Sequence, residues 1–260
     1  MQKIKRLHMK DLNDQKKIAV LIDADNAQHS KIKYILDEIS KHGHIITKKA
    51  YGDWSSEYLK NWKTVLNELA IQPIQQFAYT IGKNSTDSSL IIDAMDLLYT
   101  EKYDAFALIS SDSDFTKLAS RLRESEVYVF GVGERKTPVS FRNSCDDFVF
   151  SENLGESIII GLDKDQAATE PAANVEEIPQ DIIDALLTGW IQYKDDDGED
   201  WANVAPVGGL LKRLKPDFDP RTYGFTKITE LISKIDIFEM TKFKGKGTVN
   251  IVAYRPKTRT

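Results

Sequence analysis

The chain has 260 residues, of which 41% are hydrophobic and 29% are charged, and it carries a formal net charge of −5. This composition is typical of a soluble globular protein with room for more than one domain, and the negative charge argues against nucleic-acid binding by the whole surface. No apolar run approaches the roughly 20 residues of a membrane span, and the first residues lack the apolar segment of a secretory signal. The single cysteine, Cys145, excludes an internal disulfide framework and predicts a cytoplasmic location.

Strand and helix patterns alternate along the first part of the chain, after a polar leader at residues 1–16. Apolar runs of strand length predict strands at 18–22, 45–51, 74–79, 105–109, 127–132 and 148–150. Helices are expected between them, near 30–42, 57–70, 87–101 and 114–125. Strands separated by helices of this length predict an α/β fold, with a parallel sheet covered by helices on both faces.

The composition changes after Gly161, and residues 161–179 lack apolar periodicity, which is typical of a linker. Order returns with helices predicted near 182–187, 207–215 and 227–235, followed by short strands at 237–243 and 248–254. Three helices and a terminal hairpin describe a small winged-helix domain. The chain is therefore expected to hold two domains, at residues 17–160 and 180–257.

Carboxylates recur where the predicted strands end. Asp23 ends the first strand run, Asp112 and Asp114 follow the fourth, and Asp87 opens the helix between them. Ligands of parallel sheets bind outside the carboxyl ends of the strands, so these side chains are expected at one edge. Converging carboxylates repel one another unless a cation holds them together. Oxygen ligands without a Cys/His cluster indicate a hard divalent ion, Mg²⁺ or Mn²⁺.

Each acid also has an ordinary structural explanation. Asp87 lies where a helix start favours an anion, and Asp112 lies where the next helix needs a cap. Asp23 and Asn26 are common turn residues after a strand. Asp93 lies among apolar residues, rotated by roughly 240° from Asp87, and is expected at the site's edge or against a neighbouring group. The combination favours a metal site, because unrelated turns need not place acids at the same edge.

A divalent ion held by two or three carboxylates can activate water for in-line attack on phosphate. The spacing alone leaves a nuclease, a phosphatase and a metal-dependent phosphotransferase open. The chain has no Walker-type glycine-rich loop, which excludes nucleotide hydrolysis of that kind.

Taken in order, these motifs resemble the NYN domain family, the LabA-like branch of the PIN-like nucleases. The resemblance covers residues 17–152 and rests on the segments at 18–26, 83–95, 108–115, 133–138 and 145–148. It implies a Rossmann-like PIN fold and cleavage of RNA that depends on Mg²⁺ or Mn²⁺. The residues that take the family's metal-binding and catalytic roles by position are Asp23, Asp87 and Asp112, with Asn26, Asp93 and Asp114 in support. Asp146 matches a recurrent acid of the family, or caps the last strand.

The C-terminal segment resembles the LOTUS domain, also called OST-HTH, most clearly at residues 216–225. This resemblance implies RNA binding and protein partners. Lys242, Lys244 and Lys246 flank the expected wing, with Phe243 between them, and this pattern suits phosphate contact with base stacking. Solvated lysines are the alternative. The aromatic residues are more simply explained as fillers of a small core, and this interpretation is favoured for Trp201, Tyr223 and Phe225.

Loop cations near the acidic edge are candidates for contact with the cleaved strand, namely Lys83, Arg135, Lys136 and Arg142. The sequence thus predicts a metal-dependent ribonuclease with a C-terminal RNA-binding module. The alternatives are a non-catalytic RNA-binding or regulatory adaptor and a metal-dependent phosphatase. Because PIN-like domains often pair, the resemblance also implies a homodimer.

Overall fold

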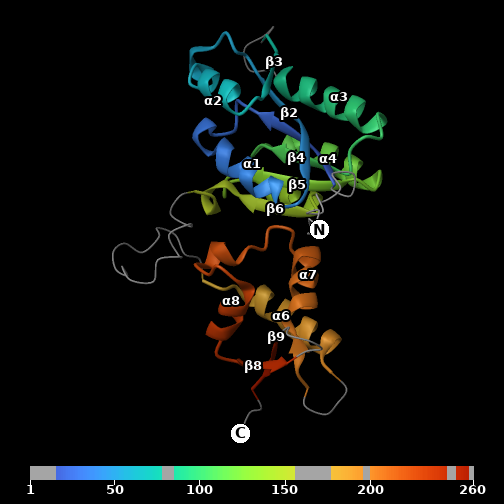
Figure 1. Cartoon of the computed structure of the whole chain (residues 1–260), viewed down its shortest axis with the longest axis vertical. Coiled ribbons are helices and arrows are strands. Elements are labelled where there is room, and N and C mark those ends of the chain that lie inside the picture. The colour runs from blue at the N-terminus through green and yellow to red at the C-terminus, as the bar shows by residue number, and fades with distance from the viewer. Residues whose placement is uncertain (1–15, 78–84, 156–176, 196–199, 245–249, 258–260) are drawn as a thin grey trace, which may run out of the picture. The chain divides into compact units, whose positions relative to one another are not determined.

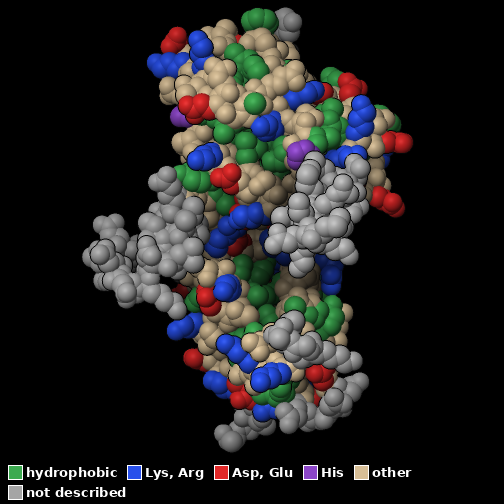
Figure 2. All heavy atoms as spheres, in the orientation of Figure 1, with side chains coloured by type: hydrophobic (Ala, Val, Ile, Leu, Met, Phe, Trp, Pro, Cys, Tyr) green, Lys and Arg blue, Asp and Glu red, His purple; other side chains and the backbone are tan. Residues whose placement is uncertain are grey.

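The computed structural model describes residues 16–77, 85–155, 177–195, 200–244 and 250–257. The chain divides into two compact units, Met1–Glu156 and Ser157–Thr260, which are described separately (Figure 1). Acidic and basic side chains are interspersed on the face of each unit that Figure 2 shows. Within the described residues, no helix combines the length and the apolar character that a bilayer crossing needs.

The first unit is built on a six-stranded sheet in the order β3-β2-β1-β4-β5-β6, in which all neighbours run parallel. The strands are β1 (Lys17–Asp23), β2 (His44–Gly52), β3 (Gln72–Gln75), β4 (Ala105–Ile109), β5 (Tyr128–Gly133) and β6 (Asp147–Phe150). This strand order is that of the doubly wound Rossmann sheet. The order in which successive strands are added reverses between β1 and β4, while all strands stay parallel. The predicted α/β class is confirmed.

Helices cover both faces of the sheet (Figure 1). They are α1 (Ile32–Ser40), α2 (Trp62–Glu68), α3 (Ser85–Tyr99), α4 (Thr116–Glu124) and α5 (Val139–Ser144). Along β1, Val20 packs with α1 and α2 in one core, while Leu21 packs with α3, α4 and α5 in the other. Burial on both faces explains why the strands are continuous apolar runs rather than alternating ones.

Three elements of the first unit differ from the predictions. The third strand occupies Gln72–Gln75 instead of 74–79, and its Pro73 is tolerated because β3 lies at the edge of the sheet. The helix expected at 57–70 is divided into a 3-10 turn, Glu57–Leu59, and α2. Helix α5 was not predicted, since its six residues are too few to show a periodic pattern.

The second unit is a winged helix. Its helices are α6 (Gln180–Tyr193), α7 (Val204–Leu214) and α8 (Ile228–Lys234), with a 3-10 turn at Pro220–Tyr223. Strands β7 (Ala202–Asn203), β8 (Phe238–Lys244) and β9 (Asn250–Pro256) form an antiparallel sheet in the order β7-β9-β8. The helices and one sheet face enclose a core centred on the fully buried side chains Leu186, Leu211, Leu231 and Tyr254.

Candidate metal and catalytic site

The acidic residues lie at the carboxyl ends of β1 and β4, where the strand order of the sheet reverses. The register pairs Ile22 of β1 with Ile109 of β4, so the next residues, Asp23 and Ser110, are neighbours. The Ser110 hydroxyl donates a hydrogen bond of 2.7 Å to Asp23 Oδ2. A crevice at this reversal is the usual ligand site of open α/β sheets.

Asp23 is fully buried and held by polar donors. Besides Ser110, the Asn26 side-chain amide donates to Asp23 Oδ2 at 2.8 Å, and the Asp25 backbone N–H donates to Oδ1 at 3.2 Å. Burial raises the pKa of Asp23, the bonds from Ser110 and Asn26 oppose that rise, and the net shift is upward. Asn26 therefore orients the Asp23 carboxylate.

Three further carboxylates meet beside Asp23. Asp87, Asp112 and Asp114 each offer an oxygen within 4.8 Å of the others. Asp87 is buried, Asp112 is half-buried and Asp114 is exposed, so the group leads from the protein interior to solvent. These three acids are up to 27 positions apart in the sequence, and Asp23 lies 91 positions before Asp114.

The electrostatics tie Asp23 to this group. Burial raises the pKa of Asp87 to about 6, and the charge of Asp23 is the next cause, followed by those of Asp112, Asp114 and Asp25. A cation bound among these oxygens would relieve the repulsion. The donor set consists of carboxylate oxygens, which hard divalent ions prefer, so the residues fit Mg²⁺ or Mn²⁺.

The loop after β4 places its acids by capping. The Asp112 backbone N–H donates to Ser110 Oγ at 3.0 Å, and the Asp112 carboxylate accepts from the Asp114 backbone N–H at 2.9 Å. That bond caps the 3-10 turn Ser113–Phe115, which leads into α4. Asp87 lies in the first turn of α3, where the helix dipole favours its charge. The capping of the turn by Asp112 and the dipole contact of Asp87 do not conflict with metal binding by the same acids.

Asp93 has other partners. Its carboxylate accepts hydrogen bonds from Lys49 Nζ at 2.7 and 2.9 Å and from the Tyr51 hydroxyl at 2.6 Å. It does not belong to the group of acids that could share an ion within the described residues. Asp93 therefore joins α3 to β2 through an ion pair, and its supporting role at the metal site stays a prediction.

The loop cations are engaged with their neighbours. Lys136 pairs with Glu134 at 2.8 Å and is exposed. The guanidinium groups of Arg135 and Arg142 each lie 5.6 Å from the ring centre of Phe150, at the carboxyl end of β6. Lys83 lies outside the described residues.

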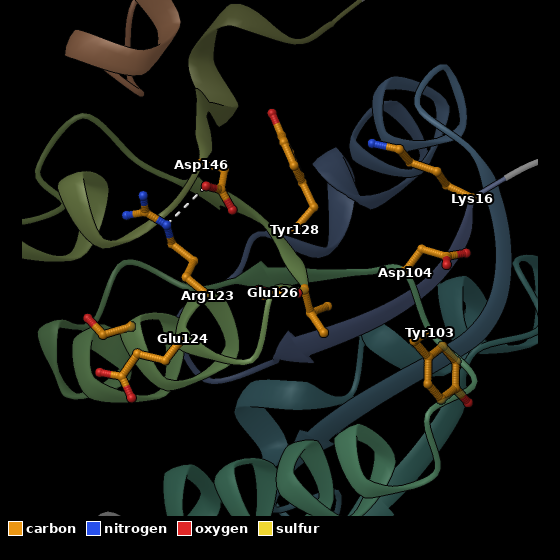
Figure 3. Close-up of a pocket in the computed structure, with 10 residues that line it drawn as sticks. Lys16, Tyr103, Asp104, Arg123, Glu124, Glu126, Tyr128 and Asp146 are labelled. Carbon is orange, nitrogen blue, oxygen red and sulfur yellow. Dashed lines mark ion pairs between the residues drawn. The ribbon is translucent and has the colours of Figure 1, made fainter.

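The predicted acid Asp146 lies at the amino ends of the strands, opposite to the carboxyl ends where Asp23 and Asp112 lie. Asp146 pairs with Arg123 at 3.0 Å and accepts a hydrogen bond from the Val129 backbone N–H. Asp146 and Arg123 line a hollow of about 770 Å³ (Figure 3). Burial, with the charges of Asp147 and Asp146, raises the pKa of nearby Tyr128 to about 12, so its hydroxyl stays protonated. Asp146 thus holds the amino ends of β5 and β6 and is remote from the acidic group.

In the second unit, Lys242 and Lys244 are exposed on β8, and Lys246 lies outside the described residues. Tyr223 and Phe225 pack against the core, as predicted. Trp201 does not belong to the core that the described residues form. The prediction of a core position was wrong for Trp201, because this residue precedes β7 and contacts Arg255 and Phe243 instead.

Sequence reasoning overlooked the positioning role of Ser110, whose hydroxyl contacts both acidic loops. Serine next to aspartate is also common in turns. The sequence alone therefore does not distinguish a turn residue from one that positions Asp23; the pairing of β1 with β4 does. The partners of Asp93 were overlooked for a similar reason, since Lys49 is 44 positions away in the sequence.

Comparison with known families agrees with this geometry. The NYN domain model matches residues 17–152, which is about half of the chain. The protein belongs to the NYN domain family, a group of PIN-like nuclease domains. Residues 174–250 match the OST-HTH/LOTUS domain, an RNA-binding module, so the chain joins the two. Both resemblances that the sequence indicated are confirmed.

Similar solved structures add little on function. A protein of unknown function from Vibrio parahaemolyticus matches at 19% identity, over 58% of this chain and 96% of its own, with a TM-score of 0.45. An uncharacterized protein from Nitrosomonas europaea matches at 28% identity, over 38% and 95%, with a TM-score of 0.29. No curated protein matches significantly. The identification therefore depends on the two domain families.

Proposed function

We propose that the chain is a metal-dependent ribonuclease, with Asp23, Asp87 and Asp112 as catalytic metal ligands and Asp114 as a further ligand. The observation that carries the proposal is the meeting of Asp87, Asp112 and Asp114 beside Asp23 in a PIN-like domain. The adjoining RNA-binding module favours RNA over a small phosphate ester as the substrate.

Mg²⁺ or Mn²⁺, when bound, supplies positive charge that activates water and stabilises the charge that develops on a phosphodiester. Asp23 holds its carboxylate in one orientation from the buried side, because Ser110 and Asn26 bind the same oxygen. Asp112 and Asp114 are the more exposed acids, so they face an incoming strand. Without a cation these carboxylates repel the RNA backbone, which makes RNA entry dependent on the metal.

We further propose that RNA is held mainly by the OST-HTH domain. An acidic site attracts phosphate poorly, so a separate basic module has a physical rationale. The candidate contacts there are Lys242, Lys244 and Lys246, and those near the acidic site are Lys83, Arg135, Lys136 and Arg142. A few phosphate contacts give modest affinity that falls steeply with salt. By resemblance to other PIN-like domains, we also propose a homodimer, and the single cysteine supports a cytoplasmic location.

Cleavage of single-stranded and structured RNA in Mn²⁺ or EDTA tests this function. We expect cleavage in Mn²⁺, none in EDTA, and a loss on the order of 100-fold or more in Asp23→Asn and Asp112→Asn. A lost ligand should cost at least as much as an outer-shell partner, which costs 10–100-fold. Asp37→Asn, on the exposed side of α1, changes one charge outside the site and should cleave normally.

Two outcomes would contradict the proposal. RNA binding without cleavage, unaffected by Asp23→Asn and Asp112→Asn, would support a non-catalytic adaptor. Metal-dependent release of phosphate from a small phosphomonoester, with intact RNA, would support a phosphatase.

A further inference from the structure

Trp201 lies on the outer face of the wing sheet, against a cation and a second aromatic ring. The Arg255 guanidinium lies over the Trp201 indole at 4.3 Å from the ring centre. The Phe243 ring meets the indole edge-on, with centroids 6.1 Å apart and an interplanar angle of 75°. Such contacts fix the orientation of a half-buried indole ring that the hydrophobic core does not enclose.

The strand register shows that this cluster faces away from the helices. Phe243 is paired with Ile251, and Arg255 with Glu239, and residues directly opposite each other share one sheet face. Tyr254, the neighbour of Arg255, points the other way and is completely buried in the core. Among the residues that the structure describes, Trp201, Phe243 and Arg255 therefore lie on the sheet face that points away from the helices.

Exposed lysines along the edge strand β8 favour a polyanion over an apolar peptide. Lys242 and Lys244, on either side of Phe243 in β8, are exposed and point to the opposite sheet face, and Lys257 is exposed just beyond β9. Glu239 forms an ion pair of 2.7 Å with Arg255, and the exposed acids Asp195 and Asp200 precede Trp201 in the chain. Strand β8 lies at the edge of its sheet, so lysines on this strand can reach a backbone that follows the edge.

We propose that Trp201 and Phe243 form a platform on which unpaired bases of single-stranded RNA stack. Arg255 is a positioning residue that holds the indole, and Lys242 and Lys244 contact the phosphates. The proposal rests on the RNA-binding role given above to the C-terminal domain. It adds the site, the outer sheet face, and the substrate class, a strand whose bases are unpaired.

Affinity of the full chain for a fluorescent single-stranded RNA, measured in EDTA by anisotropy, tests the platform. Stacking contributes about 1–3 kcal/mol per base, so Trp201→Ala and Phe243→Ala should each weaken binding by roughly 5- to 150-fold. Trp201→Phe keeps a ring and should retain most of the affinity. Leu214→Ala removes an exposed apolar side chain elsewhere in the domain and should change nothing.

The salt dependence separates stacking from charge. The alanine variants should keep the wild-type slope of affinity against salt, while Lys244→Gln should lower that slope by about one unit. Circular dichroism of Trp201→Phe and Trp201→Ala, compared with wild type, should show the same folded spectrum.

Several results would overturn the platform. Unchanged affinity in both alanine variants would exclude it while leaving Asp112-dependent cleavage intact. Equal binding of a fully paired duplex would exclude base stacking. A change of oligomeric state in Trp201→Ala would assign the face to a second copy of the chain. If wild type bound no RNA at all, both this proposal and the role of the C-terminal domain would fail.

Discussion

At the scale of single residues, the site brings together carboxylates that repel one another and that a bound cation would stabilise. Asp23 and Asp87 are buried acids whose pKa values are raised, and the neighbouring acids add to the rise for Asp87. At neutral pH, ionisation of these acids therefore destabilises the folded state of the metal-free protein. A bound divalent ion removes that cost, which couples metal binding to stability.

Asp87→Asn should stabilise the metal-free protein. The folded pKa of Asp87 is about 6 and its ordinary value is 3.8, so the folded state prefers the protonated form. The stability contribution is fully present below pH 3.8 and is lost as pH rises through 6. At pH 7.5 in EDTA the variant should gain about 1–3 kcal/mol in urea unfolding. In Mn²⁺ the wild type should become at least as stable as Asp87→Asn. Equal stabilities of the two proteins in EDTA would contradict the account.

At the scale of elements, the position of Asp87 depends on how α3 packs on β2. Lys49 and Tyr51 of β2 both bind Asp93, which lies six residues after Asp87 on the same helix. The Lys49 and Asp93 side chains are 17% and 24% exposed, so removing one partner leaves a poorly solvated charge. This ion pair fixes the helix whose first turn carries a proposed ligand.

Lys49→Met should destabilise the first unit by about 1–3 kcal/mol, less than a fully buried pair would lose. The double variant Lys49→Met/Asp93→Asn should be more stable than Lys49→Met alone, because it leaves no unpaired charge. Urea unfolding of the wild type, both single variants and the double variant gives the coupling energy. Additive effects of the two substitutions would show that the pair does not act as a unit.

In the second unit, Asp219 organises the turn before α8. Its carboxylate caps the turn at the Arg221 backbone and binds the Arg221 guanidinium at 2.7–3.0 Å. Burial alone would raise the pKa of Asp219, but the hydrogen bonds and charge of Arg221 outweigh it and lower this pKa. Its stability contribution is thus present above pH 3.8 and lost as pH falls through the lower folded pKa.

Asp219→Asn should therefore lower the stability of the C-terminal domain at pH 7 by about 1–3 kcal/mol and reduce the loss of stability as pH falls below 3.8. Hydrogen exchange of the α8 amides reports on this unit separately from the first. The NYN domain amides serve as the internal control, and an unchanged exchange rate in α8 at pH 7 would contradict the assigned role.

How far the sequence predicts the structure depends on the length and burial of each element. Five of the six parallel strands were predicted near their observed positions, because burial on both faces leaves an unbroken apolar run such as Ile18–Ile22. Strand β7 has two residues and α5 has six, so neither produces a periodic pattern. The meeting of acids followed from positions at strand ends and, for Asp87, at a helix start, whereas the Lys49–Asp93 pair depends on tertiary packing that no local pattern encodes.

At the scale of the whole molecule, the chain joins an acidic PIN-like domain to a domain with exposed cations at its wing. A net charge of −5 does not favour RNA binding by the surface as a whole, so local sites have to supply it. The proposed division of labour gives phosphate and base contacts to the OST-HTH domain and cleavage to the NYN domain. Metal occupancy then controls whether the second step can follow the first.

Direct measurement of Mn²⁺ binding by titration calorimetry tests the central claim, that acids from β1, α3 and the β4 loop share a cation. We predict that wild type binds Mn²⁺ and that Asp23→Asn, Asp87→Asn and Asp112→Asn each weaken binding at least about 10-fold. Asp37→Asn should bind like wild type. Mn²⁺ binding that is absent in wild type, or unchanged in all three site variants, would contradict the account.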